Sequence, residues 1–193
     1  RDRAGTGTGA VGVEVSDATE PATDVDNVEE VDEVTPAPVM YGVPLTDSFG
    51  QAVVHPSRDE YARVLREAAD DGFTVAVDVT AVDYLEFDGR TLPDGVPAER
   101  FEVVVNLLDI GQRRRLRVRV QVPEGEPVVP SLFDLHPGTE AFEREVYDMF
   151  GIEFSDHPDL TRILMPEDWE GHPLRKDYAV GEIPVQFKHV GAR

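Results

Sequence analysis

The clearest hydrophobic pattern in the chain predicts a helix between Ser57 and Gly72. Ser57 is followed three residues later by Glu60, the spacing of a capping box that satisfies the first backbone N–H groups of a helix. Gly72 suits the left-handed conformation that commonly ends a helix. The apolar side chains in between recur at intervals of three and four residues, as on one helix face: Tyr61, Val64, Leu65, Ala68 and Ala69.

Three segments with the side-chain pattern of β-strands follow this helix. Residues 73–79 alternate apolar and polar side chains, whereas residues 101–108 are apolar on both sides, which suits a central strand. Residues 115–122 alternate again, with leucine and valine on one side and arginine or glutamine on the other. A short turn at residues 109–112 joins the last two strands. Residues 85–100 contain Gly and Pro and are expected to form a loop or a small hairpin.

A second helix is predicted from about Thr139 to Phe150, because apolar side chains form a stripe along it and Gly151 is placed to end it. Beyond Phe154 neither the helical nor the strand period continues, and prolines recur. We therefore expect residues 155–193 to form an extended arm that is ordered mainly by the surface on which it lies.

Together these patterns predict an α+β fold. We expect a small sheet of three or four strands, mostly antiparallel, with the two helices on one face, followed by the extended C-terminal arm. The expected organisation is an acidic disordered tail at residues 1–39, a globular domain at residues 40–154, and a partner-binding arm at residues 155–193.

Composition narrows the possible functions. The formal net charge is −21, and residues 1–35 hold ten acidic residues against two arginines, so the other 158 residues keep −13. An acidic surface repels phosphate groups, which argues against nucleic acid or an anionic membrane surface as partner. The chain contains no cysteine, so it forms no disulfide and lacks the thiolate ligands of iron–sulfur clusters. It also contains no run of about 18 apolar residues, so we expect no membrane span. Its first residues are acidic and include no apolar core, so we expect no signal peptide.

Candidate chemistry concentrates in residues 165–178, M-P-E-D-W-E-G-H-P-L-R-K-D-Y, which include the only tryptophan, Trp169. His157 and His172 stand near acidic residues but lack the paired spacing of known metal motifs, so a metal-dependent hydrolase is a weak alternative. The acids themselves lie among cations that favour their ionised form. A charge-paired segment for another protein's surface is the favoured interpretation.

The same region carries a family resemblance. Residues 143–152 read E-R-E-V-Y-D-M-F-G-I, residues 157–166 read H-P-D-L-T-R-I-L-M-P, and residues 167–178 complete the motif. This pattern resembles the C subunit, or 30 kDa subunit, of the proton-pumping NADH-quinone oxidoreductase known as respiratory complex I. Residues 80–84, T-A-V-D-Y, are similar to the family's globular domain. Thr161 departs from the pattern, since relatives often carry a basic residue there, which puts one cationic contact of the arm in doubt.

The resemblance implies a polypeptide without catalytic residues of its own, in the quinone-reducing module of the peripheral arm of the complex. Its implied partners are the D subunit, which helps form the quinone cavity, and the B subunit, which holds the terminal iron–sulfur cluster. FMN and the clusters would lie on other subunits, and NADH and quinone would be substrates of the complex. The implied location is the cytoplasmic side of the bacterial membrane. A related membrane-bound hydrogenase or F420H2 dehydrogenase would carry a similar component and remains an alternative.

Trp and Arg are favoured anchors of protein interfaces. We therefore expect Arg162, Trp169 and Arg175 to contact the partner. Glu143, Arg144 and Asp148 are expected to fix the second helix to the arm or to the partner. The nine candidate residues are Glu143, Arg144, Asp148, Arg162, Trp169, His172, Arg175, Lys176 and Asp177.

Overall fold

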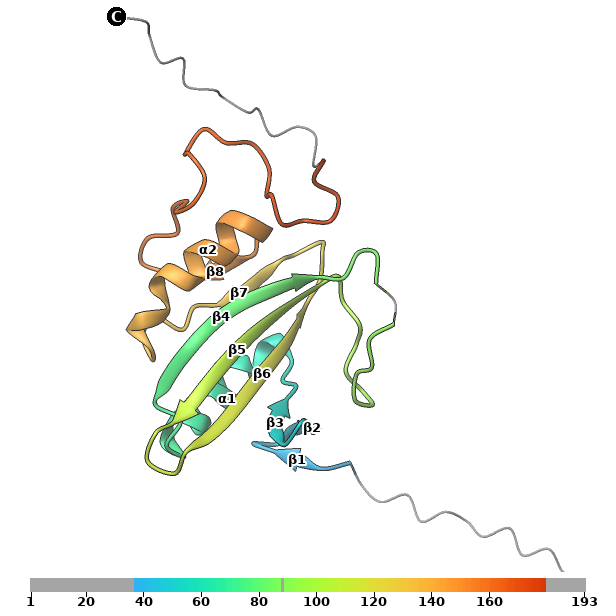
Figure 1. The fold of residues 1–193 in the computed structure, drawn as a ribbon, viewed down its shortest axis with the longest axis vertical. Coiled ribbons are helices and arrows are strands. Elements are labelled where there is room, and N and C mark those ends of the chain that lie inside the picture. The colour runs from blue at the N-terminus through green and yellow to red at the C-terminus, as the bar shows by residue number, and fades with distance from the viewer. Residues whose placement is uncertain (1–36, 88, 180–193) are drawn as a thin grey trace, which may run out of the picture. The chain divides into compact units, whose positions relative to one another are not determined.

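The computed structural model describes residues 37–87 and 89–179 (Figure 1). Residues 1–36 and 180–193, which include most of the predicted tail and the end of the predicted arm, lie outside the described residues. In chain order the elements are β1 (Val39–Met40), β2 (Val43–Ser48), β3 (Gln51–Val54), α1 (Arg58–Asp70), β4 (Val75–Asp83), β5 (Phe101–Asp109), β6 (Arg114–Val122), β7 (Val128–Pro130), the 3₁₀ turn η1 (Pro137–Thr139), α2 (Glu140–Phe150) and β8 (Glu153–Ser155).

The main sheet has six strands in the order β1-β2-β3-β6-β5-β4. All neighbours are antiparallel except β3 and β6, which run parallel. Strands β7 and β8 form a separate parallel pair. The predicted α+β class and the mostly antiparallel sheet are confirmed, but the expected three or four strands were too few. The missing strands β1 to β3 are short and contain Pro44 and Asp47, which break the alternation on which the prediction depended.

Both helices cover one face of this sheet, as predicted (Figure 1). Apolar side chains of α1 and α2 share a single core with the inward side chains of β4, β5 and β6. At the start of α1 the backbone N–H of Ser57 donates to the Glu60 carboxylate at 3.0 Å, so the capping box forms. Helix α2 lies over β4 and buries Val146, Met149 and Phe150. The opposite face of the sheet carries Arg115, Arg117 and Arg119 of β6, which alternate with the buried side chains of that strand.

Residues 156–179, which we call the arm, contain no helix or strand. Figure 1 shows the arm in orange to red, beside α2. The last strand, β8, ends at Ser155. The boundaries of the three predicted segments remain predictions.

Candidate functional site

The arm closes the C-terminal end of α2. A helix leaves its last four carbonyl groups without partners inside the helix. Here the carbonyl of Asp148 accepts a hydrogen bond from His172 Nδ1 at 3.0 Å, and the carbonyl of Met149 accepts one from the backbone N–H of Leu174 at 3.0 Å. Arg175 Nε donates to the carbonyl of Phe150 at 2.6 Å. The arm therefore supplies partners that the helix lacks and fixes its own path in doing so.

Gly151 makes this close approach possible. Its φ of 70° is left-handed, the conformation that favours glycine after a helix, and its N–H donates to the carbonyl of Tyr147 at 2.8 Å. A Cβ atom at this position would lie 2.5 Å from His172 Nε2 and 2.8 Å from Arg175 Nη2. Both the backbone conformation and the packing of the arm therefore require glycine here.

Asp148 is the most heavily bonded side chain of the site, and it is fully buried. One carboxylate oxygen accepts a hydrogen bond from Arg162 Nη1 at 2.6 Å. The other accepts three, from the backbone N–H groups of Ile163, Leu164 and Met165 at 3.1, 2.7 and 2.8 Å. Burial raises the pKa of Asp148, but these donors outweigh it and hold the pKa below its ordinary value. The carboxylate is thus ionised and orders the turn at residues 162–165.

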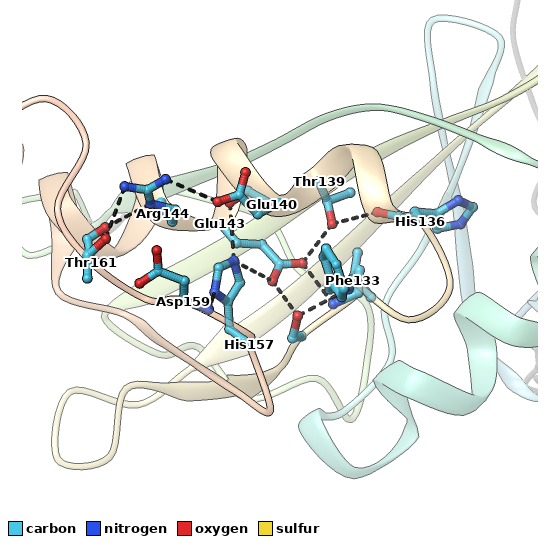
Figure 2. Close-up of polar contacts among 11 residues, drawn as sticks. Phe133, His136, Thr139, Glu140, Glu143, Arg144, His157, Asp159 and Thr161 are labelled. Atoms are coloured by element: carbon cyan, nitrogen blue, oxygen red, sulfur yellow. Dashed lines mark hydrogen bonds and ion pairs between the residues drawn. The ribbon is translucent and has the colours of Figure 1, made fainter.

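Arg144 binds the preceding part of the arm (Figure 2). Its Nε donates to the carbonyl of Thr161 at 3.0 Å and its Nη2 to the Thr161 hydroxyl at 3.0 Å. Glu140 accepts from Arg144 Nη1 at 3.1 Å, which holds the guanidinium group in place. The threonine that departs from the family pattern therefore accepts a hydrogen bond that a basic side chain could not accept.

Glu143 is buried on the other side of α2 and faces the loop that leads from β7 (Figure 2). Its carboxylate accepts hydrogen bonds from Ser131 Oγ at 2.6 Å, the N–H of Leu132 at 2.8 Å and Thr139 Oγ1 at 3.0 Å. Burial raises the pKa of Glu143, and these donors oppose the rise. His157 Nε2 lies 4.0 Å away. Glu143 thus joins α2 to the loop before it and is closed off from the surface.

A second attachment joins the arm to the end of β4. The backbone N–H of Lys176 donates to the Asp83 carboxylate at 2.9 Å. Arg100, whose side chain is almost fully buried, pairs with Asp83 at 2.9 Å and with Asp177 at 2.7 Å. These two carboxylates raise the pKa of Arg100 above its ordinary value. The sequence patterns did not single out Arg100 or Asp83, although Asp83 lies within the quoted T-A-V-D-Y segment.

Three large apolar side chains of the arm stay at the surface, beside charged ones such as Glu167 and Asp168. Ile163, Leu164 and Leu174 are 41%, 59% and 49% exposed. Trp169 is half-buried, and its Nε1 donor is buried with no hydrogen-bond partner among the described residues. Lys176 is exposed, and its side chain forms no ion pair with the part of the chain that the structure describes. The arm is therefore held on the domain by some of its polar groups while a set of large apolar side chains remains exposed.

A metal centre finds no support in this geometry. Across residues 37–87 and 89–179, no three His, Asp or Glu side chains gather closely enough to hold a metal ion. His157 contacts Glu140 and Glu143, whereas His172 is bonded to the end of α2, and burial lowers the pKa of His172. The two histidines thus belong to separate networks. The described helices also include none long and apolar enough to cross a membrane.

Comparison with known proteins agrees with the motif. The chain matches the family model described as "Respiratory-chain NADH dehydrogenase, 30 Kd subunit" over residues 53–183. The C subunit of the NADH-quinone oxidoreductase of Saccharopolyspora erythraea is 42% identical over 147 residues, covering 75% of this chain and 55% of that protein. NADH-quinone oxidoreductase subunit 5 of Thermus thermophilus is 43% identical over 153 residues, covering 76% and 71%. A solved structure described as "Nqo5 of the trypsin-resistant fragment (1-134) in P63 form" is 38% identical with a TM-score of 0.54, covering 62% of this chain and 90% of that one.

The chain therefore belongs to the family of the 30 kDa subunit of the respiratory-chain NADH dehydrogenase. The resemblance carried by residues 143–178 is confirmed, because that motif lies inside the matched range. The chain spans about half the length of several curated relatives that it matches, with 55%, 53% and 49% of their lengths covered.

Proposed function

We propose that this chain is a non-catalytic subunit of a proton-translocating NADH:quinone oxidoreductase and that the arm attaches it to the assembly. One observation carries the proposal: polar groups fix the arm on α2 while its apolar side chains stay exposed. A segment that is held in one conformation before it binds loses less conformational entropy on docking. The arm is therefore suited to be an interface on a rigid support.

The nine residues expected at the interface divide into two groups by their contacts. We propose direct partner contacts for Trp169, Lys176 and Asp177, which reach the surface, together with the exposed Ile163, Leu164 and Leu174. The buried Trp169 Nε1 has no acceptor among the described residues, so we expect the partner to provide one. The other residues hold the arm or its supporting helix in place: Glu143, Arg144, Asp148, Arg162, His172 and Arg175.

The proposed partners are the D subunit, as the main contact, and the B subunit of the same complex. The family membership supports this assembly, and the relatives are named as subunits of NADH-quinone oxidoreductase. A chain without cysteine is unsuited to ligating an iron–sulfur cluster, so FMN, the clusters and the site of quinone reduction would lie on other subunits. The proposed position is peripheral, on the cytoplasmic side of the membrane, in the quinone-reducing module.

The substitution Leu164→Asp tests the proposed interface. It places a charge on an apolar group that is 59% exposed, and it leaves the N–H that bonds Asp148 in place. Ile110→Asp is the matched control, because Ile110 is 67% exposed in the turn between β5 and β6, at the far end of β5 from Arg100, which pairs with the arm. Burying an unpaired charge in an interface costs several kcal/mol. We expect L164D to lower the amount of assembled complex and its NADH:quinone activity at least tenfold, whereas I110D leaves both near wild type.

Three readouts separate the interface from simple instability: the melting temperature of each isolated variant, the co-purified partner subunits, and activity in membranes. Surface substitutions change stability by only about 0.5 kcal/mol, so both variants should melt like the wild-type chain. If L164D assembled as well as I110D, the arm would not be the interface.

A further inference from the structure

The sheet face that points away from the helices is hollowed. One hollow of about 730 Å³ lies between β2, the central strands and the loop at residues 91–93. A second, of about 790 Å³, lies between the turn joining β2 to β3 and residues 113–117, and it reaches round the end of the sheet to Phe73, which belongs to the core under the helices. Ser48 and Arg117 line both, so the two hollows are neighbours. We call the two hollows together the sheet groove.

Arginine side chains line the sheet groove along β6. Arg115, Arg117 and Arg119 occupy alternate positions of one strand and therefore project from the same side, with a spacing of about 6.7 Å. Arg119 is neutralised by Glu102, whose carboxylate it contacts at 2.7 and 2.9 Å. Arg117 donates only to the neutral Asn106 side chain, at 3.1 Å. The arginine at one end of the row, Arg119, is thus paired with a carboxylate, whereas those toward Arg115 are not.

The unpaired end is exposed. Arg113 and Arg115 are exposed, and within residues 37–87 and 89–179 no carboxylate lies within 4.0 Å of Arg113, Arg115 or Arg117. Asp47 also lines the groove, but it accepts a hydrogen bond from the backbone N–H of Gly50 at 2.9 Å and stays with its own turn. The groove therefore presents three arginines that form no ion pair with the described residues, and the carboxylate of Asp47 is a single negative charge beside them.

The groove is positively charged, whereas the rest of the chain is acidic. Outside residues 1–35 the chain carries −13, so the groove is a positive strip on an acidic body. A duplex nucleic acid would meet the surrounding acidic surface over its whole length and be repelled. A short extended peptide would interact with the strip alone, and its alternate side chains repeat at about the same 6.7 Å as the arginines. Phe49, fully exposed at the turn between β2 and β3, adds an apolar contact at the unpaired end.

We propose that the sheet groove is a second interaction surface, which binds an extended acidic segment of a partner protein through Arg113, Arg115 and Arg117. The surface lies on the face of the sheet opposite the helices and is separate from the docking arm. That the partner is another component of the complex rests on the proposed function, whereas the binding chemistry does not.

Fluorescence anisotropy of the full chain with a labelled 12-residue peptide of alternating Glu and Thr tests the proposal, at about 50 mM salt so that screening is modest. The same peptide with Gln in place of Glu is the neutral probe. Arg115→Glu is the test variant, and Arg66→Glu on α1 is its control, since Arg66 is exposed and undergoes the same charge change on the helix-covered face. We expect saturable binding of the acidic peptide that weakens at least fivefold with R115E and less than twofold with R66E.

Four results would overturn the proposal. They are no saturable binding of the acidic peptide, equal binding of the Gln peptide, equal effects of R115E and R66E, and tighter binding of a DNA oligonucleotide of the same charge. Self-association of the chain that R115E abolishes would assign the groove to a second copy instead. Melting curves of both variants check that each is folded. The measurement uses the isolated chain, so its result is independent of the proposed function. The groove can fail to bind the peptide while the arm still assembles the complex, and the groove can bind the peptide while the arm does not.

Discussion

The substitution Asp148→Asn removes the charge that orders the arm while keeping the size of the side chain. The amide oxygen can still accept from the backbone N–H groups of residues 163–165, which lie 2.7–3.1 Å from the native carboxylate. The amide NH₂ must then face Arg162 Nη1, where the native oxygen lies at 2.6 Å, so two donors oppose each other. Removing one partner of a buried charge pair costs about 3–5 kcal/mol.

This loss should open the arm without unfolding the domain. The core of α1, α2 and the main sheet does not include Asp148, and weakly packed segments open locally at lower free energy than the whole fold. Since each ~1.4 kcal/mol changes an equilibrium tenfold, the amides of Ile163, Leu164 and Met165 should exchange with solvent about a hundred- to a few-thousand-fold faster in D148N. Amide hydrogen exchange followed by mass spectrometry or NMR measures this directly.

The control is Glu145→Gln, which makes the same chemical change at an exposed position of α2. E145Q should leave the protection of residues 163–165 as in the wild type, and strands β4 to β6 should keep their protection in both variants. If D148N left the three amides protected, or if E145Q exposed them equally, the claim that the buried carboxylate holds the arm would be refuted.

Three further predictions concern the same contacts. Gly151→Ala should lower the free energy of opening the arm by about 2–4 kcal/mol, because the new Cβ would lie 2.5 Å from His172 and φ is 70°. A rate of proteolysis of the arm equal to that of the wild type would contradict this. Arg175→Lys should lower the free energy of opening the arm by about 1–2 kcal/mol, because an ammonium group cannot reproduce the hydrogen bond from Nε to the carbonyl of Phe150. An unchanged hydrogen-exchange rate of the Leu174 amide would count against this. The folded-state pKa of Asp148 is lowered, so its stabilisation is complete above its ordinary value of 3.8 and is lost as the pH falls through the folded value. Protection of residues 163–165 should therefore drop on acidification in the wild type, and D148N should lack this component.

Local sequence patterns predicted the helices well, because their determinants lie within a few residues of one another. Ser57 and Glu60 form the cap that their spacing indicated, and Gly151 ends α2 in the left-handed conformation. The strands of residues 39–54 were missed because the residues that stabilise them lie far away in the sequence. β3 gains its place by pairing in parallel with β6, more than sixty residues further along the chain.

The candidate site was predictable in its residues but not in its contacts. Motif and charge selected Asp148, Arg162 and Arg175, yet their partners include backbone N–H and C=O groups, which every residue carries and no sequence pattern distinguishes. Glu143, for example, binds the loop of residues 131–139 within its own chain, a contact that no local pattern indicated. Charge and motif membership therefore selected candidate residues, whereas only the fold shows to what each is bonded.

The most direct test of the account is to purify the tagged full-length chain from detergent-solubilised membranes and identify every protein and cofactor that comes with it. We predict stoichiometric D and B subunits, together with a flavin, iron–sulfur clusters and NADH:quinone activity. A chain that purified without partners, or with a hydrogenase or an F420H2-oxidising enzyme and without NADH:quinone activity, would contradict the proposed function.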